Sequence, residues 1–122
     1  MIHGVGIDLV EIKRIKEWYD KRPTMVNKIL TDNELEIFNK INLDNRKVEF
    51  ISGRFAVKEA FTKAMGTGIG KKYGFHSINC LPDENGKPEI ACDGFHVHTS
   101  ITHTEKYAEA IVIIEKDNNK QE

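Results

Sequence analysis

The chain has 122 residues, of which 39% are hydrophobic and 30% are charged. This length fits one domain, and a chain of this size buries roughly two-thirds of its unfolded surface without help from a disulfide or a metal. The 18 Lys and Arg residues against 19 Asp and Glu residues argue against a general nucleic-acid binder and an acidic disordered protein. We therefore expect a single globular domain over residues 1–122, with a frayed tail from about residue 116.

The sequence shows no sign of a membrane span or a secretory signal. No apolar run approaches the ~20 residues of a spanning helix, and the first residues lack a basic region followed by a long apolar stretch. Cys80 and Cys92 lack metal-type spacing and are too few for a disulfide framework. We expect free thiols, a cytoplasmic location and neither a membrane nor a nucleic-acid partner.

The charge is uneven along the chain although it sums to −1. Residues 11–28 carry six Lys or Arg and three Asp or Glu, whereas residues 64–122 carry six Lys and nine acidic residues. This asymmetry suggests that an early element meets an acidic partner.

The first half of the chain predicts one strand followed by helices. Residues 5–10 form an apolar stretch typical of a buried strand, and residues 11–21 have the apolar spacing of a helix. Residues 31–34 have the pattern of a capping box, which predicts a helix through about Lys40. The longest helical pattern runs from Asn45 to Met65 and ends at a glycine, a typical C-terminal stop.

The second half predicts a glycine-rich loop over residues 66–70, followed by strands. Turn residues separate the first two strands, and the strongest strand pattern lies near the C-terminus. Helices early and an antiparallel sheet late indicate an α+β fold. The expected strands span residues 75–81, 88–92, 94–102 and 107–114.

Asp8 lies inside the first predicted strand, among apolar neighbours. A carboxylate at such a place is costly unless it is paired, hydrogen-bonded or bound to a cation. Two interpretations stay open, a cap of the following helix and a metal ligand.

Glu59 and Lys63 lie one turn apart and so share a face of the long predicted helix. An isolated pair of this kind is usually a surface ion pair worth ~0.3–0.5 kcal/mol. This face continues towards Gly66-Thr67-Gly68, whose backbone amides, together with Lys63, could hold phosphate oxygens. Because these glycines follow a helix rather than open one, they form neither a P-loop nor a dinucleotide fingerprint.

Three histidines of the predicted sheet are weaker candidates. His103 follows a strand among hydroxyl residues, where a histidine is more often structural than catalytic. His96 and His98 share a strand face, but no Cys or carboxylate accompanies them at metal-type spacing. We interpret these two as residues of the sheet surface.

Four segments together resemble the holo-acyl-carrier-protein synthases, the small bacterial type of 4′-phosphopantetheinyl transferase. They occur in the family's order over essentially the whole chain, and together they are specific although each alone is weak. Val57 and Thr102 stand where the family usually has Ala and Ser, and neither change removes a charged group. The four segments are Gly4-Val-Gly-Ile-Asp8 followed by Arg14, Phe55-Ala-Val-Lys58-Glu59-Ala60 with Lys63, Gly66-Thr-Gly68, and Ser100-Ile-Thr-His103-Thr.

The resemblance implies that the 4′-phosphopantetheine group of coenzyme A is transferred to a serine of apo acyl carrier protein, as fatty acid biosynthesis requires. Adenosine 3′,5′-bisphosphate would leave. The implied catalytic residues are Asp8, Glu59 and Lys63, of which Asp8 and Glu59 would hold Mg²⁺, with Mn²⁺ as an alternative metal. The general base stays open between Glu59 itself and a metal-bound water held by a carboxylate.

The resemblance also implies a homotrimer with active sites at the subunit interfaces, and an apolar sheet face of Phe95, Val97 and Ile111 would be consistent with it. The acidic carrier protein would meet the basic early helix. The implied coenzyme A contacts are Lys58, Lys63, Gly66, Thr67, Gly68, Pro88 and His103. The implied carrier contacts are Lys13, Arg14, Lys21, Arg22 and Met25.

Overall fold

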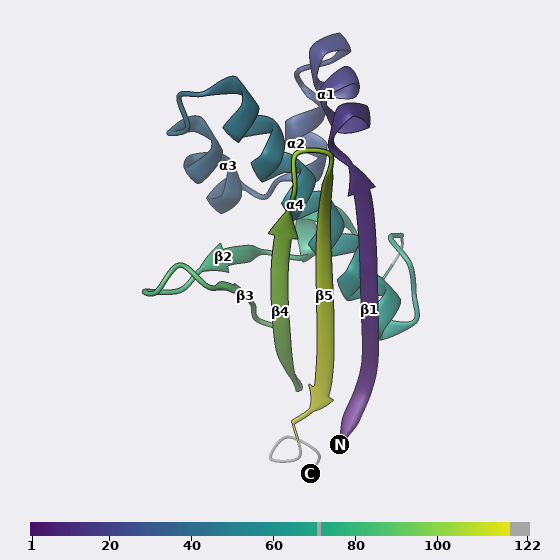
Figure 1. The fold of residues 1–122 in the computed structure, drawn as a ribbon. Coiled ribbons are helices and arrows are strands. Elements are labelled where there is room, and N and C mark those ends of the chain that lie inside the picture. The colour runs from purple at the N-terminus through teal and green to yellow at the C-terminus, as the bar shows by residue number, and fades with distance from the viewer. Residues whose placement is uncertain (71, 118–122) are drawn as a thin grey trace.

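The computed structural model describes residues 1–70 and 72–117, in which helices pack on one face of an antiparallel sheet (Figure 1). The predicted α+β class is confirmed. Among the described residues, no helix has the length and apolar character needed to cross a membrane. The elements are β1 (Ile2–Glu11), α1 (Ile12–Lys21), α2 (Met25–Ile29), α3 (Asp32–Asn39), α4 (Asp44–Met65), the 3₁₀ helix η1 (Phe75–Ser77), β2 (Cys80–Pro82), β3 (Pro88–Ile90), β4 (Phe95–His103) and β5 (Tyr107–Lys116).

The main sheet has the strand order β1-β5-β4, so the first and last strands of the chain pair with each other. Asp8 lies opposite Ala110 of β5, and Ala110 lies opposite Ile101 of β4. A separate hairpin of β2 and β3 projects to the left in Figure 1. Residues of β1 and of β4 therefore lie at opposite edges of the main sheet.

Helix α4 lies between two clusters of buried residues, which explains why it is apolar on more than one side. One cluster fills the space between α4 and the sheet, and includes Phe61 and Val112. The other fills the space between α4 and the shorter helices, and includes Ile29 and Ile51. The long helix thus forms the centre of the molecule.

Two glycines of β1 allow an unusually close approach to α4. A Cβ atom on Gly4 would overlap the carbonyl oxygen of Ala64, and one on Gly6 would overlap that of Ala60. No other residue fits at either position without moving the strand or the helix. Close packing of β1 on α4 therefore requires glycine at these two positions of the first family-like segment.

Several predicted boundaries differ from the structure. Strand β1 includes Glu11, so α1 begins one residue later than expected, and the short helix α2 was not predicted. The expected strand over residues 75–81 is wrong in its first part: residues 75–77 form η1, and pairing begins only at Cys80. Five-residue helices such as α2 leave too short a pattern to detect from sequence.

The last strand is longer than predicted. Strand β5 continues through Lys116, and Glu115 and Lys116 pair with Ile2 and Phe95 respectively. The tail was expected to fray from about residue 116, and residues 118–122 of it lie outside the described residues.

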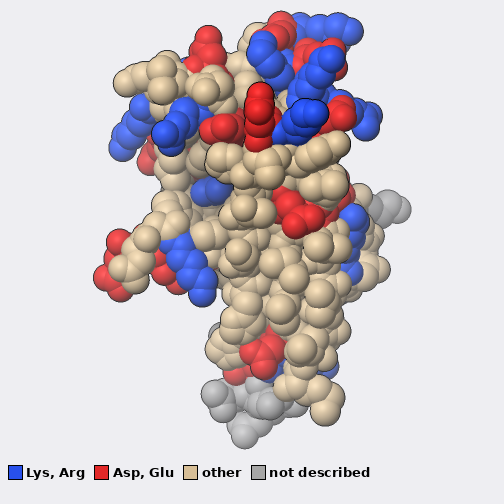
Figure 2. Space-filling view, viewed as in Figure 1, with Lys and Arg blue, Asp and Glu red and all other residues tan. Residues whose placement is uncertain are grey.

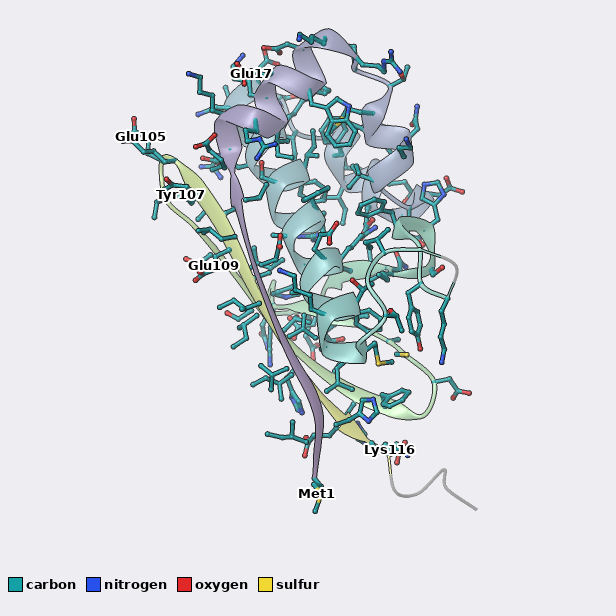
Figure 3. All side chains as sticks on the ribbon, turned by 90° about the vertical axis from the view of Figure 1, so that its right-hand side faces the viewer. Met1, Glu17, Glu105, Tyr107, Glu109 and Lys116 are labelled. Atoms are coloured by element: carbon teal, nitrogen blue, oxygen red, sulfur yellow. The ribbon has the colours of Figure 1, made fainter. Side chains whose placement is uncertain are left out.

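The outer face of the sheet is apolar and largely without charged side chains in Figure 2. Val5, Ile7 and Leu9 of β1 are each more than half exposed there, and Ile111 of β5 joins them. Figure 3 shows this sheet face from the side, turned away from the helices.

Two residues predicted for the exposed face lie on the other side of the sheet. Phe95 and Val97 pack against the core cluster between the sheet and α4, and only Ile111 was placed correctly. Alternation along β4 turns Phe95 and Val97 inward, while His96 and His98 are exposed.

Candidate active site

Asp8 and Lys63 meet where β1 packs against the C-terminal half of α4. The ammonium nitrogen of Lys63 lies 3.0 Å from Oδ1 of Asp8 and donates a second hydrogen bond of 3.0 Å to the carbonyl oxygen of Ile7. The Asp8 side chain is 16% exposed and that of Lys63 is 52% exposed. The carboxylate is thus largely buried while the ammonium still reaches solvent.

The two open interpretations of Asp8 can now be separated. Helix α1 has Glu11 at its N-cap position, and no side chain makes a capping hydrogen bond there. Asp8 instead points to α4, where Lys63 is its partner. The helix-cap interpretation is therefore wrong, and the interpretation of Asp8 as a metal ligand stays a prediction.

Glu59 adds a second carboxylate beside Asp8 and Lys63, and these three residues form the acidic cluster. Partial burial raises the pKa of the Glu59 carboxyl, the charge of Asp8 raises it further, and Lys63 lowers it. Two carboxylates with one ammonium leave a net negative charge. Among the described residues, no group of three or more His, Cys, Asp and Glu side chains is placed to hold a metal. A pair of carboxylates fits Mg²⁺, which usually keeps several waters and binds substrate phosphates in addition.

The loop after α4 does not provide the amide cradle that the sequence suggested. Gly66 has φ +79° and ends the helix as predicted. The amides of Thr67 and Gly68 both point back to the carbonyl oxygen of Thr62, at 3.0 and 3.4 Å. Because the amides of Thr67 and Gly68 are already used, only the part of that prediction that concerns Lys63 stays open.

The predicted contact of Lys58 with coenzyme A does not fit the structure. Lys58 is completely buried, and its ammonium donates to the carbonyl oxygens of Ile29 and Phe75 and to Oε1 of Glu34. These acceptors lie at 2.8, 2.9 and 2.6 Å and take all three hydrogens. Adjacent helical residues point about 100° apart, so Lys58 faces the helical layer while Glu59 faces β1.

His103 lies at the opposite edge of the sheet from Asp8, at the end of β4. Its Nδ1 is 3.9 Å from Oε2 of Glu49, and both line a pocket of about 360 Å³. Arg46 and Arg54 of α4 line the same pocket, so three basic side chains gather there. Neither arginine was predicted from the sequence, although their spacing of eight residues places them on one helix face.

Pro88 lies at this same edge, in a separate cavity of about 690 Å³ between β3 and β4. His96 and His98 line this cavity too. The Nε2 atom of His98 lies 2.7 Å from Oε1 of Glu115, and both histidines are exposed on the sheet as predicted. Pro88 therefore lies at the same edge of the sheet as His103, and at the opposite edge from Asp8.

The four basic residues predicted for carrier binding lie on and just after α1 and are exposed, whereas Met25, also predicted, lies in α2. Met25 is only 3% exposed and packs in the cluster between α4 and the shorter helices, so its predicted contact does not fit. Figure 2 shows Lys and Arg side chains gathered, with acidic ones among them, at the end of the molecule that α1 forms. The exposed basic residues are Lys13, Arg14, Lys21 and Arg22.

A cavity of about 460 Å³ lies between the basic residues of α1 and the acidic cluster. Asp8 and Arg14 both line it, and the rings of Trp18 and Phe55 form an apolar wall. The two rings meet edge to face with centroids 6.5 Å apart. Sequence analysis did not predict this aromatic wall, because it joins residues from two helices far apart in the chain.

The chain has an α+β fold with two carboxylates and one ammonium group gathered between β1 and α4, and comparison with known proteins identifies its class. The model of the 4′-phosphopantetheinyl transferase superfamily matches residues 4–114. A holo-[acyl-carrier-protein] synthase of Staphylococcus aureus (strain JH9) is 56% identical over 116 residues, which cover 95% of this chain and 98% of that protein.

Solved structures agree with the sequence comparison. The holo-(acyl-carrier-protein) synthase of Bacillus anthracis in complex with CoA (3′,5′-ADP) has a TM-score of 0.89 and 42% identity, covering 96% of this chain and 99% of that one. The Helicobacter pylori synthase in complex with coenzyme A has a TM-score of 0.81 and 28% identity, covering 91% and 99%. The chain belongs to the 4′-phosphopantetheinyl transferase superfamily, and it is a transferase of the holo-acyl-carrier-protein synthase type.

Proposed function

We propose that the chain transfers 4′-phosphopantetheine from coenzyme A to a serine of an apo acyl carrier protein, at the cluster of Asp8, Glu59 and Lys63. The serine oxygen forms a bond to the β-phosphorus of the coenzyme A pyrophosphate, and the bond from that phosphorus to the bridging oxygen breaks. The products are the holo carrier protein and adenosine 3′,5′-bisphosphate. The observation that carries the proposal is this cluster in a chain of this family.

Asp8 and Glu59 are the residues that would hold Mg²⁺. Bound there, the metal supplies positive charge that offsets the charge of the pyrophosphate and of the leaving phosphate. Lys63 adds a positive charge from its position beside Asp8, and its exposure lets it reach a phosphate oxygen. The serine proton would pass either to Glu59 itself or to a metal-bound water held by a carboxylate.

The exposed basic residues Lys13, Arg14, Lys21 and Arg22 would bind the acidic carrier protein. Arg14 lines the cavity that leads to Asp8, so a carrier bound there could bring its serine to the acidic cluster. Opposite charges on the two proteins would speed their encounter and orient them. We place this reaction in the cytoplasm, which suits a chain whose two cysteines are free.

The complete site would need a second copy of the chain. Asp8 and Glu59 lie beside one edge strand, whereas His103 and Pro88 lie at the other edge, with β5 between them. A head-to-tail ring of copies would bring one edge next to the other, and the family resemblance makes this ring a homotrimer. The exposed apolar face of β1 and β5 supplies a surface for such contacts.

Subunit mixing tests the shared site. Asp8→Ala and His103→Ala proteins, each with little activity alone, are unfolded together, refolded and assayed. Random mixing should restore roughly a quarter of the sites, because each site then draws its two halves from different copies. Mixing Asp8→Ala with Glu59→Gln is the matched control, since both changes affect the same half and no recovery is expected. Absence of recovery in the first mixture would contradict the shared site.

A further inference from the structure

Lys58 and Glu34 form an ion pair that is completely buried in the helical layer. Their charged atoms are 2.6 Å apart, and burial lowers the pKa of Lys58 while Glu34 opposes this effect. Removing two charges from water costs several kcal/mol, and apolar residues of similar volume are often as stable. Stability alone therefore gives no reason for charges at these two positions.

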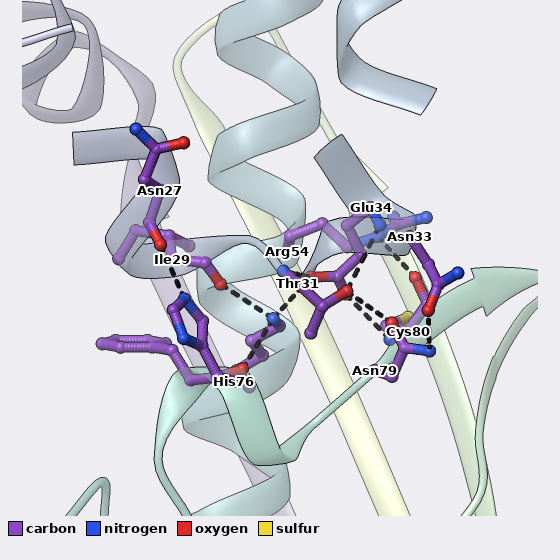
Figure 4. A network of polar contacts seen from close by, with 11 residues as sticks. Asn27, Ile29, Thr31, Asn33, Glu34, Arg54, His76, Asn79 and Cys80 are labelled. Carbon is purple, nitrogen blue, oxygen red and sulfur yellow. Dashed lines mark hydrogen bonds and ion pairs between the residues drawn. The ribbon is translucent and has the colours of Figure 1, made fainter. Parts of the chain in front are cut away.

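The pair connects two segments, residues 29–31 and residues 75–80, to α4 (Figure 4). Glu34 accepts hydrogen bonds of 2.8 Å from the amides of Thr31 and Cys80, which lie before α3 and at the start of β2. Lys58 donates to the carbonyl oxygen of Ile29 at the end of α2 and to that of Phe75 in η1. Both segments thus have their positions against α4 fixed by a single pair of side chains.

One of these segments supports the cavity beside Asp8. The ring of Phe75 stacks on that of Phe55, with centroids 5.6 Å apart and planes 30° apart. Phe55 in turn meets Trp18, and these two rings are the apolar wall of the cavity that Asp8 and Arg14 also line. A displacement of Phe75 would therefore change the wall without touching any charged group of the site.

We propose that Lys58 and Glu34 are positioning residues for the carrier protein: they hold Phe75, and through it the Phe55–Trp18 wall, in the shape that the incoming serine segment meets. This inference rests on the proposed docking of the carrier at Arg14. It assigns the pair no contact with either substrate, so its effect should fall on the carrier and not on coenzyme A.

The test is the double variant Glu34→Gln/Lys58→Met, which removes both charges at similar volume. The side-chain oxygen of the introduced glutamine can still accept a hydrogen bond from the amide of Thr31 or of Cys80, whereas its NH₂ group only donates. Kinetics are measured with apo carrier and with coenzyme A, alongside thermal unfolding. The KM for the carrier should rise about tenfold, equivalent to ~1.4 kcal/mol, while kcat and the KM for coenzyme A stay within about twofold. Ser52→Ala is the matched control, because it removes a buried hydrogen bond from the same helix to Val48 and should leave the carrier KM unchanged.

Phe75→Leu is a second variant that keeps the ion pair and removes only the ring stacking. It should raise the carrier KM in the same direction, and it decides the matter if the double variant does not fold. An unchanged carrier KM in Phe75→Leu or in the folded double variant overturns the inference, as does a parallel rise in both KM values. A wild-type protein that modifies no carrier overturns the proposed function itself, which distinguishes that failure from this one.

Discussion

The ammonium nitrogen of Lys63 lies 3.0 Å from the carboxylate of Asp8, although 55 positions separate the two residues. This pair joins the edge strand β1 to the central helix α4, and Glu59 lies one turn before Lys63 on the same helix. The geometry depends on how closely the strand and the helix approach. The backbone of β1 is therefore as much a part of the site as its side chains are.

Gly6→Ala should disrupt the site without changing any charged residue. Its Cβ would overlap the carbonyl oxygen of Ala60, so β1 must move away from α4 and carry Asp8 with it. We expect a loss of about 1–3 kcal/mol in the free energy of unfolding, measured with denaturant, and a large loss of kcat. Gly70→Ala is the control, since a Cβ there meets no atom within 4 Å. Wild-type stability and activity in Gly6→Ala would show that the close approach is not required.

Glu59→Gln should make the metal-free protein more stable at pH 7 while abolishing transfer. The folded-state pKa of Glu59 is raised, so the native protein binds more protons than the unfolded one over the pH interval from about the ordinary 4.5 up to the raised value. Stability falls as the pH rises through this interval, and the charged carboxylate remains unfavourable above it. Thermal unfolding in EDTA should show the advantage of the variant at pH 7 and its disappearance below about pH 4.

Addition of Mg²⁺ extends the same experiment to the metal site. A ligand that binds only the native state raises its stability, so the wild-type protein should gain stability as Mg²⁺ is added. Glu59→Gln and Asp8→Ala should gain little. Equal gains in all three proteins would mean that Mg²⁺ binds elsewhere.

Arg14→Ala should weaken binding of the carrier protein. The exposed guanidinium lines the cavity that leads to Asp8, so its loss should raise the KM for the carrier about tenfold and leave that for coenzyme A unchanged. Added salt should affect the variant less than the wild type, because fewer charges then attract the carrier. Lys116→Ala is the control, as Lys116 lies at the far end of the molecule from α1 (Figure 3). If both variants behave alike, the docking helix is misassigned.

The two thiols should differ in reactivity towards an alkylating reagent. Burial raises the pKa of Cys80 to about 11, and the side chain is inaccessible, whereas Cys92 is partly exposed. At pH 8, intact mass with peptide mapping should find the label on Cys92 first, and on Cys80 only after unfolding. Labelling of Cys80 at the rate of Cys92 would indicate that the β2 region opens in the native state.

The features predicted correctly from the sequence are those that depend on residues close together in the chain. The capping box at Thr31 forms as expected, with the hydroxyl accepting from the amide of Glu34 and the Glu34 carboxylate accepting from that of Thr31. A carboxylate among apolar strand residues also marked Asp8 correctly as a residue in need of a partner, although β1 is an edge strand with one exposed face and not the buried strand that the sequence predicted. These features depend on neighbours within a few positions, which a sequence contains.

Non-local packing explains the errors. Glu34 also holds Lys58, 24 positions away, and nothing in the helical pattern shows that Lys58 faces the helical layer. Met25 belongs to a helix too short to detect, and its burial follows from that helix. Strand alternation places Phe95 and Val97 on one face of β4 and His96 and His98 on the other. Which of the two faces is buried depends on the side of the sheet on which α4 packs.

The most direct test of the central claim is the mass of the carrier protein. Apo acyl carrier protein is incubated with the wild-type chain, coenzyme A and Mg²⁺, and its intact mass and modified residue are determined. The account predicts the gain of one 4′-phosphopantetheine group on a serine, and no gain with Asp8→Ala or Glu59→Gln. An unmodified carrier in the presence of folded wild-type protein, or full modification by either variant, would contradict it.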